Sequence, residues 1–462
     1  WTAARDPPWR PRGCGLPRPG SFRPMAWHVV IAGGGFGGFY AARRLERVLP
    51  HQSARVTLVT SENFLLYTPL LPGAAAGTLE PRHVVIPLRE ELERTEIALG
   101  RMTGLDADAR RLSYRSVDGE DVDLSYDQLI LGLGSVTRVP PIPGLSDHGL
   151  GFKTLADAIA LRNSALRNLE IAESLDDPDA RRPYLTFVFV GAGYAGVEGI
   201  AELQDYVADV IDRYPRCRLD GTRWLIADLA DRIMPEISPG LAEFAARELR
   251  ARGIEVRPGT GLSSVAADAV TLSDGERVPT RLLCWTAGVR PPPLAAELGL
   301  PLADAGRIAV DETLRVRGRE DVWAIGDVAA VPDPAKGGRG PTPPTAQHAL
   351  RQGRLAAENV AATLGHGRVR RFKYKTLGVF VDMGRHQAVA EMVGVKLSGF
   401  AAWWAARTYH LALMPGAARR LRLVTDWTVG LLFGRAAAEL GQLGHPPPLG
   451  EGETLAESDE RG

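Results

Sequence analysis

The chain has 462 residues, enough for about three domains, and its 55 basic residues balance its 55 acidic ones. Hydrophobic residues make up 45% and charged residues 24% of the sequence, which argues for folded domains with large cores and against a mainly disordered protein. Because the net charge is zero, the composition does not point to nucleic acid as a partner. The three cysteines, Cys14, Cys217 and Cys284, are widely spaced, so we expect neither a disulfide scaffold, nor a metal site, nor a dithiol redox centre.

Both ends of the sequence have the composition of disordered segments. Residues 1–24 are rich in Arg and Pro and contain no apolar core of signal-peptide length, so we predict a disordered arm. Residues 449–462 are acidic and polar, and we predict a disordered tail there. No uninterrupted apolar run reaches the roughly 18 residues of a membrane-spanning helix, so we expect no such helix.

The first folded unit begins at residues 27–32, a short apolar run bounded by glycine that is typical of a buried parallel strand. Gly33, Gly35 and Gly38 follow with the spacing of a dinucleotide-binding turn, and a helical pattern and a strand at 55–59 come next. Small residues in such a turn let backbone N–H groups approach a pyrophosphate at the helix N-terminus. A single glycine turn of this kind is weak evidence, because such turns have many uses.

The same pattern recurs later in the chain. Residues 184–190 predict an apolar strand that leads into Gly191, Gly193 and Gly196, and residues 197–203 predict the helix that follows. Two glycine turns, each placed between a strand and a helix, make coincidence improbable. The sequence therefore predicts either two dinucleotide sites or one dinucleotide site and one flavin site.

The residue that ends the second strand of each unit bears on which nucleotide binds. In the later unit this residue is Asp228, whose carboxylate can accept both ribose hydroxyls and would repel a 2′-phosphate, so NADH is favoured over NADPH. Arg223 and Arg232 lie close by in the sequence and leave a strict preference open. In the first unit the corresponding residue is Thr60, and Glu62, the predicted ribose contact, lies two residues further on.

Further motifs resemble those of the flavoproteins that have two dinucleotide-binding domains. A predicted strand ends in Asp327, which resembles the Asp that contacts the ribityl chain of the flavin in that superfamily. Gly134 and Gly288 belong to segments that resemble the short crossings by which the chain leaves each nucleotide domain. The resemblance covers roughly residues 26–370 and implies that the first glycine turn binds FAD and the second binds NADH.

Within that superfamily the chain resembles the type II, non-proton-pumping NADH:quinone oxidoreductases. The segments that carry this resemblance are residues 67–72, residues 345–349 with the sequence Thr-Ala-Gln-His-Ala, residues 396–404, and Asp426 with Trp427.

Other members of the superfamily fit the residues less well. Disulfide reductases need a closely spaced cysteine pair on the flavin face, which this chain lacks. Sulfide:quinone oxidoreductases use paired cysteines, whereas Cys217 and Cys284 lie in or beside the predicted NADH domain. One departure concerns the type II resemblance itself, since many members carry Gln where this chain has Arg351, with Gln352 next to it.

The resemblance implies roles for three further residues. Glu198 corresponds to a glutamate that contacts the nicotinamide and is proposed to deliver protons, although an acidic residue is also favoured in any first helical turn. Gln347, preceded by Ala346, would lie beside the flavin and the quinone head group, unless it is an ordinary residue at a helix N-terminus. Glu202, one turn after Glu198, is predicted to be solvated or to lie between domains.

The C-terminal region, residues 371–448, is predicted to associate with a membrane. Between residues 397 and 418 the only charged residue is Arg407, and aromatic side chains are concentrated there. Apolar, Trp-rich faces next to arginines are typical of helices that lie in the headgroup plane, with the arginines facing anionic lipid. A dimer interface on the same apolar surface is the alternative. The arginines in question are Arg419, Arg420 and Arg422.

These patterns together predict an α/β fold of two Rossmann-like dinucleotide-binding domains, with the NADH domain inserted in the FAD domain, plus a C-terminal amphipathic helical membrane-anchoring region. The predicted segments in chain order are the arm at 1–24, the first part of the FAD domain at 25–150, the NADH domain at 151–298, the second part of the FAD domain at 299–370, the C-terminal region at 371–448 and the tail at 449–462.

The implied function is that of a flavoenzyme that transfers a hydride from NADH to FAD and then two electrons to a membrane quinone, without proton pumping. We expect a homodimer bound peripherally to the cytoplasmic side of the cell membrane, with FAD and NADH (NAD) as cofactors and with neither a metal nor a nucleic-acid partner. Two alternatives stay open: a soluble NAD(P)H-dependent flavin reductase that uses ferredoxin or another acceptor, and an NADH-binding flavoprotein that acts as a redox sensor.

Overall fold

The structure is a computed structural model that describes residues 27–374, 378–392 and 394–440. The arm predicted at 1–24 and the tail predicted at 449–462 lie outside the described residues.

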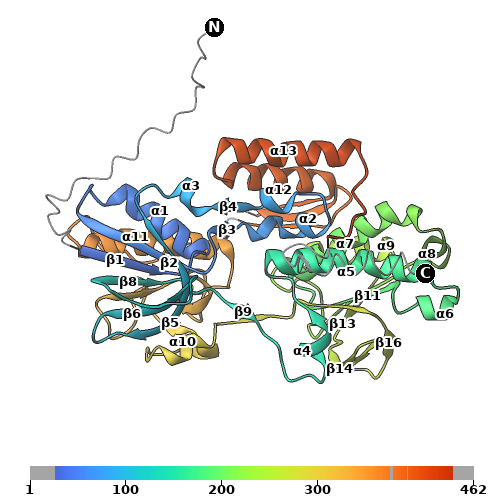
Figure 1. Ribbon diagram of the computed structural model, residues 1–462, viewed down its shortest axis with the longest axis horizontal. Coiled ribbons are helices and arrows are strands. Elements are labelled where there is room, and N and C mark those ends of the chain that lie inside the picture. The colour runs from blue at the N-terminus through green and yellow to red at the C-terminus, as the bar shows by residue number, and fades with distance from the viewer. Residues whose placement is uncertain (1–26, 375–377, 393, 441–462) are drawn as a thin grey trace, which may run out of the picture.

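The described chain forms two lobes and a C-terminal helical region (Figure 1). One lobe is built on strand β1 (Trp27–Ala32) and the other on strand β11 (Thr186–Val190). Helices α12 (Gly399–Leu413) and α13 (Ala417–Leu432) lie along the upper edge of Figure 1. The two lobes correspond to the two strand–turn–helix units that the sequence predicts, and the expected α/β fold is confirmed.

The first lobe contains a seven-stranded sheet with β1 near its centre. Its strands in spatial order are β20 (Val322–Ala324), β8 (Gln128–Leu131), β1, β2 (Ala54–Thr60), β5 (Glu96–Asp106), β6 (Arg111–Ser116) and β7 (Asp121–Ser125). The strands from β20 to β5 pair in parallel, and β6 and β7 extend the sheet antiparallel. A first strand flanked on both sides by later parallel strands is the dinucleotide-binding arrangement.

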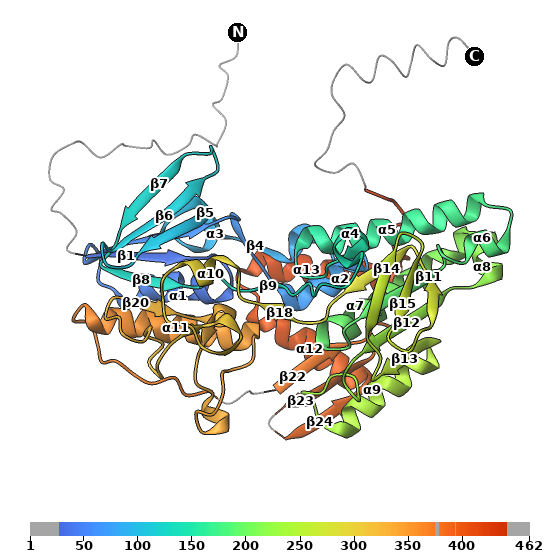
Figure 2. The ribbon, with the colours of Figure 1, turned by 90° about the horizontal axis from the view of Figure 1, so that it is seen from below.

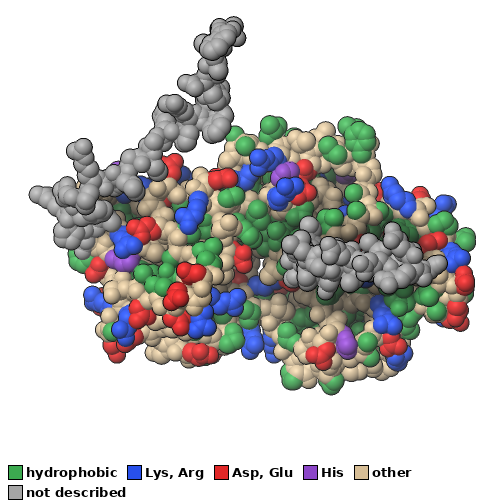
Figure 3. All heavy atoms as spheres, viewed as in Figure 1, with side chains coloured by type: hydrophobic (Ala, Val, Ile, Leu, Met, Phe, Trp, Pro, Cys, Tyr) green, Lys and Arg blue, Asp and Glu red, His purple; other side chains and the backbone are tan. Residues whose placement is uncertain are grey.

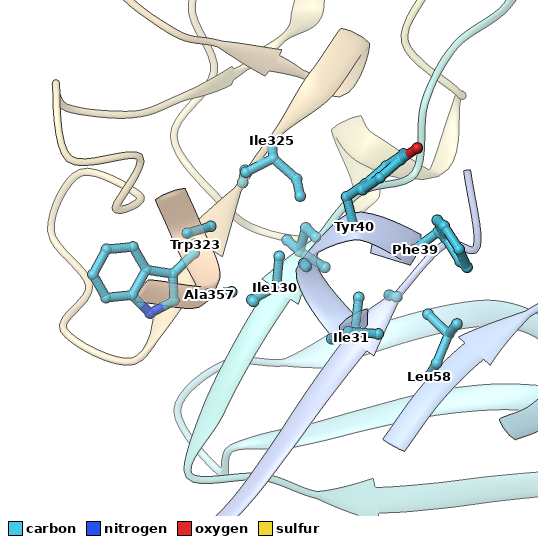
Figure 4. Packing of buried hydrophobic residues seen from close by; sticks show 14 of the residues in the cluster. Ile31, Phe39, Tyr40, Leu58, Ile130, Trp323, Ile325 and Ala357 are labelled. Atoms are coloured by element: carbon cyan, nitrogen blue, oxygen red, sulfur yellow. The ribbon is translucent and has the colours of Figure 1, made fainter. Parts of the chain in front are cut away.

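The core of this lobe lies between the sheet and two helices, α1 (Phe36–Val48) and α11 (Ala346–Thr363), which pack against each other. Gly353 permits this close packing, because a Cβ at that position would collide with the carbonyl oxygen of Gly37. The central strands are apolar and fully buried because helices cover them. Figure 4 shows the packing of Ile31, Phe39, Tyr40, Leu58, Ile130, Trp323, Ile325 and Ala357.

The second lobe contains a five-stranded parallel sheet. Its strands in spatial order are β10 (Gly149–Leu150), β17 (Leu282–Trp285), β11, β12 (Arg223–Asp228) and β13 (Ile254–Pro258). Phe187 and Phe189 of β11 face the helical side of this sheet, whereas Val188 and Val190 face the other side. The helices on the first side are α5 (Leu155–Ser174), α7 (Tyr194–Val210) and α9 (Pro239–Ala251). The other side packs against β14 (Leu262–Ala266), β15 (Ala269–Leu272) and β16 (Arg277–Pro279).

A two-stranded ribbon connects the lobes (Figures 1 and 2). Strand β9 (Val136–Thr137) pairs antiparallel with β18 (Val289–Arg290), so the two segments by which the chain leaves each lobe lie side by side. The indole N–H of Trp285 also donates to the carbonyl oxygen of Arg138 at 2.8 Å. The β20 strand comes after this ribbon in the chain and returns to the first sheet.

The C-terminal region begins with a small antiparallel sheet that carries helix α12 on one face. Its strands are β22 (Gly378–Asp382), β23 (Ala388–Met392) and β24 (Val395–Ser398). Strand β22 lies against α7 of the second lobe, and α13 follows α12 after the turn at Pro415 and Gly416. In the part of the chain that the structure describes, no helix has both the length and the apolar character needed to cross a bilayer.

Short elements complete the two lobes. The helices are α2 (Leu71–Ala75), α3 (Leu88–Glu91), α4 (Leu145–His148), α6 (Pro178–Arg181), α8 (Pro215–Asp220) and α10 (Leu294–Glu297). The strands are β3 (Phe64–Leu66), β4 (Val85–Pro87), β19 (Ile308–Ala309) and β21 (Ala329–Ala330).

Candidate active site

The first glycine turn connects β1 to the N-terminus of α1. Gly33 adopts a φ of +105°, a left-handed conformation that favours glycine, and its N–H donates to the Val59 carbonyl oxygen at 2.8 Å. A Cβ on Gly38 would collide with the carbonyl oxygen of Gly33, so the turn and the helix can approach each other only with glycine there. A Cβ on Gly35, the N-cap of α1, would meet open space. The turn therefore leaves an open position at a helix N-terminus, which fits the pyrophosphate of a dinucleotide.

At the end of β2 the expected ribose contact is less well defined. Thr60 is buried against the glycine turn, where a Cβ added to Gly34 would touch its hydroxyl oxygen. Glu62 lies two residues further on, is exposed, and donates its backbone N–H to Thr60 Oγ1 at 3.4 Å. The Glu62 carboxylate is thus free of the sheet core, and a ribose contact by Glu62 stays a prediction.

The second glycine turn repeats the geometry of the first. Gly191 adopts a φ of +110°, and a Cβ on Gly196 would collide with the Gly191 carbonyl oxygen. Gly193 is the N-cap of α7 and has open space beside it, as Gly35 has. Asp228 ends β12, and its carboxylate accepts the N–H of Ala192 in this turn at 2.5 Å. The carboxylate is therefore fixed beside the turn, where an adenosine ribose would lie.

Arg223 and Arg232 lie near Asp228 in the sequence and bear on the choice between NADH and NADPH. Both guanidinium groups donate hydrogen bonds to other protein groups. Arg223 donates to the carboxylates of Glu255 at 2.7 Å and Glu276 at 3.0 Å. Arg232 donates to the carbonyl oxygens of Pro235 at 2.7 Å and Ile237 at 3.0 Å. Neither guanidinium is free to meet a 2′-phosphate, which favours NADH.

Asp327 takes part in a polar chain that the sequence did not reveal. The Ser135 hydroxyl donates to Asp327 Oδ2 at 2.6 Å, and the Lys153 ammonium donates to Ser135 Oγ at 2.9 Å. Burial lowers the pKa of Lys153, while the nearby Asp327 carboxylate acts in the opposite direction. Ser135 follows Gly134, which has a φ of +68° and open space for a ligand. These residues come from both lobes, and only their packing brings them together.

Gln347 lies in the first turn of α11, after Ala346, and already has two protein partners. Its Nε2 donates to the Gly378 carbonyl oxygen at 3.0 Å, and its Oε1 accepts the Tyr374 hydroxyl at 2.7 Å. Arg351, one turn later, donates to the Gln347 carbonyl oxygen and lies over the Tyr374 ring. The predicted amide is therefore held in a fixed orientation at the start of β22.

The neighbouring Gln352 has a structural role. It is fully buried, accepts the Gly326 N–H at 2.7 Å, and donates to Thr342 Oγ1 at 3.0 Å. It holds the turn that precedes Asp327 and does not face open space.

Glu198 lies in a pocket where α7 meets the first lobe and the C-terminal region. Its Oε1 accepts the backbone N–H of Asp382 at 3.1 Å. The two ends of strand β22 therefore contact two predicted site residues. Gly378 at its start is bound by Gln347, and Asp382 at its end is bound by Glu198. The pocket lining includes Pro69, Glu198, Glu202, Asp382, Arg407 and His410.

The acidic groups in this pocket are poorly solvated. Burial raises the pKa of Glu198 well above its usual range and raises that of Asp382. Burial also raises the pKa of Glu202 to about 7, with a further contribution from Asp382. Glu202 is only 4% exposed, because β22 and α12 cover this face of α7, so the first alternative, a solvated residue, is wrong. The second alternative agrees with the structure, since Glu202 lies where α7 of the second lobe meets the first lobe and the C-terminal region. Burial lowers the pKa of His410 to about 4.

The remaining predicted residue, Gly288, adopts a φ of +92° beside the ribbon between the lobes and has open space next to it. Of the described residues, none forms a cluster of His, Cys, Asp and Glu suited to a metal ion. Glu202, Asp382, Lys153 and His410 were missed as site residues. Only the spacing of Glu202 four residues after Glu198 could have indicated one of them.

Comparisons with known proteins match nearly the whole chain. A model of the pyridine nucleotide-disulphide oxidoreductase family matches residues 27–353. The demethylphylloquinone reductase of Synechocystis is 31% identical over 407 residues, which cover 86% of this chain and 95% of that protein. A type II NADH:quinone oxidoreductase of Mycobacterium tuberculosis is 30% identical and covers 89% of each chain. The NDH2 structure from Plasmodium falciparum in complex with NADH has the same fold, with a TM-score of 0.83 at 20% identity over 89% of this chain and 99% of that one.

Proposed function

The chain belongs to the pyridine nucleotide-disulphide oxidoreductase family and, within it, to the type II NADH:quinone oxidoreductases, and we propose that it oxidises NADH and reduces a membrane quinone without pumping protons. The observation that carries this proposal is the match to quinone reductases along almost their full length. The match covers 89% of this chain and so reaches into the C-terminal region, which contributes Asp382 and Arg407 to the pocket around Glu198.

The first lobe would bind FAD. Gly33, Gly35 and Gly38 would hold the pyrophosphate of FAD at the N-terminus of α1, with Glu62 near its ribose. Bound FAD supplies the redox chemistry, since it can take a hydride from NADH and give two electrons to a quinone. Asp327, oriented by Ser135, would hold a hydroxyl of the ribityl chain, and Gly134 leaves the backbone open beside it.

The second lobe would bind NADH. The turn formed by Gly191, Gly193 and Gly196 would hold its pyrophosphate, and Asp228 would accept its ribose hydroxyls. Gly288 leaves room beside the ribbon that joins the lobes. Hydride transfer requires close contact between two rings, so the contribution of these residues is mainly positioning.

Two side chains would act near the reacting groups. Glu198 accepts the Asp382 N–H, and burial raises its pKa well above the usual range, so it can hold or release a proton beside the nicotinamide. Gln347, preceded by Ala346, would place an uncharged amide beside the flavin and the quinone head group. Its bonds to Gly378 and Tyr374 fix the direction of that amide.

The cysteines support this assignment over thiol-based chemistry. Cys217 and Cys284 are both buried, and neither forms a disulfide. Burial raises the pKa of Cys217 to about 12 and raises that of Cys284 still further. Both thiols therefore stay protonated, whereas disulfide and sulfide chemistry needs thiolates.

We further propose that α12 and α13 bind the protein peripherally to the cytoplasmic side of the cell membrane. Trp404 is 60% exposed and Leu432 71%, and hydrophobic side chains appear along the upper edge of Figure 3, where α13 lies. Exposed apolar side chains next to arginines suit the headgroup region of a bilayer. The predicted orientation of Arg419 toward lipid is wrong, because this residue is buried in an ion pair with Glu91. The alternative role of this surface is to form the interface of a homodimer.

The visible spectrum of the purified protein tests the function. We expect a yellow protein whose flavin absorbance is bleached by NADH within the mixing time and returns when a short-chain quinone is added. A colourless protein that consumes no NADH would contradict the proposal. Electron transfer to ferredoxin but to no quinone would support the soluble reductase instead, and bleaching slower than seconds would support a sensor.

A further inference from the structure

Helix α7 carries an acidic stripe, which we define as Glu198, Glu202, Asp205 and Asp209. Successive members are four, three and four residues apart, so all four lie on one face of the helix. The stripe runs from the glycine turn and the pocket outward to solvent. The Asp205 side chain is 12% exposed, and the Asp209 side chain is 43% exposed at the outer end.

Glu202 differs from the other members because, within the described part of the chain, its carboxylate has neither a hydrogen-bond nor an ion-pair partner. Glu198 accepts the Asp382 N–H, and Asp205 is paired with Arg435 at 2.5 Å and with Arg385 at 3.0 Å. Glu202 is 96% buried and lines the pocket, yet among the described residues none donates a hydrogen bond to it. An unpaired carboxylate in such a place is stable only when it holds a proton or meets a ligand.

Burial is the largest cause of the raised pKa of Glu202, and the charged groups around it act in both directions. Asp382 and the neighbouring stripe carboxylates favour the protonated form, and the surrounding guanidinium groups favour the ionised form. Arg407 is half-buried and lies over the rings of Trp403 and Trp427. Its Nε has no hydrogen-bond partner among the described residues. The groups that face Glu202 are Glu198 and Asp205 on α7, Asp382 on β22, Arg407 on α12, Arg252 after α9 and Arg435 after α13.

The proposed reaction creates a demand for one proton. Oxidation of NADH supplies two electrons and one proton as a hydride, whereas reduction of a quinone to a quinol consumes two electrons and two protons. One proton must therefore come from water in every turnover. Helices α12 and α13, which we propose to face lipid, cover one side of the pocket, so water would have to supply the proton from the α7 side.

We propose that the acidic stripe is the path by which this proton enters, and that Glu202 passes it into the pocket. The O–H bond of the Glu202 carboxyl breaks as the proton passes to the oxygen of the reduced quinone. The Glu202 carboxylate then takes a new proton from water at the outer end of the stripe, where the Asp209 side chain is exposed. This inference rests on the proposed function and adds a second proton-transferring residue to Glu198.

The two half-reactions of the Glu202→Gln enzyme test the proposal, because only one of them needs the proton. We expect bleaching of the flavin by NADH to stay within about twofold of the wild-type rate, and reoxidation by a quinone to slow roughly tenfold or more. The solvent deuterium isotope effect on reoxidation should rise as well. Glu243→Gln, an exposed charge removal on α9, is the matched control and should change neither step. Unchanged reoxidation, or equal slowing of both steps, would overturn the proposal.

A titration without NADH or quinone gives an independent readout. Infrared difference spectra between pH 5 and 9 should show a protonated-carboxyl band that titrates near neutral pH in the wild type and is missing in Glu202→Gln. Glu202→Asp, which keeps a carboxyl group, should recover part of both the band and the rate of flavin reoxidation. This variant keeps the test decisive if Glu202→Gln folds poorly. An unchanged band in Glu202→Gln would refute the inference. Wild-type protein that shows the band but reduces no quinone would refute the proposed function instead.

Discussion

The ammonium group of Lys153 lies where the two lobes meet, and it completes the polar chain through Ser135 to Asp327. This ammonium is half-buried, and the nearby Asp327 and Asp157 carboxylates offset part of its desolvation. Lys153 is therefore a positioning residue for the flavin hydroxyl that Asp327 would hold. Its hydrogen bond joins the second lobe to the flavin side of the first.

We expect Lys153→Met to weaken FAD binding about tenfold, because the loss of one charge-assisted hydrogen bond leaves the Ser135–Asp327 pair without its link to the second lobe. Fluorescence titration of the apoprotein with FAD measures the dissociation constant. Lys336→Met, which removes an exposed lysine from the short 3-10 helix at Pro334–Lys336, should leave this constant unchanged. An equal effect of the two substitutions would argue against the positioning role.

The raised pKa of Glu202 also predicts how stability depends on pH. The folded protein holds this proton up to about pH 7, whereas an unfolded chain releases it near pH 4.5. The contribution of this group to the free energy of unfolding is therefore largest below pH 4.5 and falls as the pH rises toward 7. The full loss is on the order of 3 kcal/mol.

Glu202→Gln should remove this dependence, so the variant gains stability relative to the wild type as the pH rises from 5 to 8. Urea unfolding at several pH values measures the difference, and Glu243→Gln again serves as the control. A difference between variant and wild type that does not change with pH would contradict the prediction.

At the scale of elements, the sequence patterns located the two strand–turn–helix units because their signals are local. The apolar run and the glycines of each unit are adjacent in the sequence, and Asp228 ends the next strand along the chain. The surroundings of Glu202 and Arg419 depend instead on contacts between segments far apart in the chain, such as α7 with β22 and α13 with α3. Arginine on an amphipathic helix gives the same sequence pattern whether it faces lipid or a buried glutamate, so the inward turn of Arg419 could not be predicted.

The exposed apolar face of α12 and α13 predicts a separable membrane function. We expect Trp404→Glu combined with Leu432→Glu to abolish flotation with vesicles that contain anionic lipid, because each charge must be moved into the headgroup region. Turnover with NADH and ferricyanide should stay within about twofold, since neither side chain lines the pocket. Leu219→Glu, at an exposed site on α8, is the control. Flotation of the double variant at the wild-type level would favour a dimer interface on this face. Sedimentation of the wild type and of the double variant would then reveal the dimer.

At the scale of the whole molecule, the C-terminal region joins the two lobes by ion pairs. Arg419 on α13 pairs with Glu91 of the first lobe at 2.7 Å, and Arg435 pairs with Asp205 of the second lobe at 2.5 Å. Asp426 also accepts from His83 at 2.6 Å. Deletion of everything after residue 395 would therefore damage both lobes, and point substitutions are the sounder test of lipid binding.

The buried pair of Arg419 and Glu91 predicts an asymmetry between its two partners. Glu91→Gln removes the nearer carboxylate from the Arg419 side chain, which is only 7% exposed. The carboxylate that remains, Glu90 at 3.2 Å, is more exposed and is the weaker partner. We expect a loss of about 3 kcal/mol of stability for this variant. Arg419→Met should lose less, because an apolar side chain of similar length fills the space and Glu91 keeps Arg43 at 3.4 Å.

Thermal unfolding of the flavin-loaded enzyme, together with the rate of tryptic cleavage after α13, measures both variants of this pair. Arg422→Met, on the exposed face of the same helix, should match the wild type in both measurements. Because the pair fastens α13 to the first lobe only, Glu91→Gln should speed cleavage near residues 433–440 while NADH binding at the second lobe persists. Greater damage from Arg419→Met than from Glu91→Gln would mean that packing, and not the buried charge, holds the C-terminal region in place.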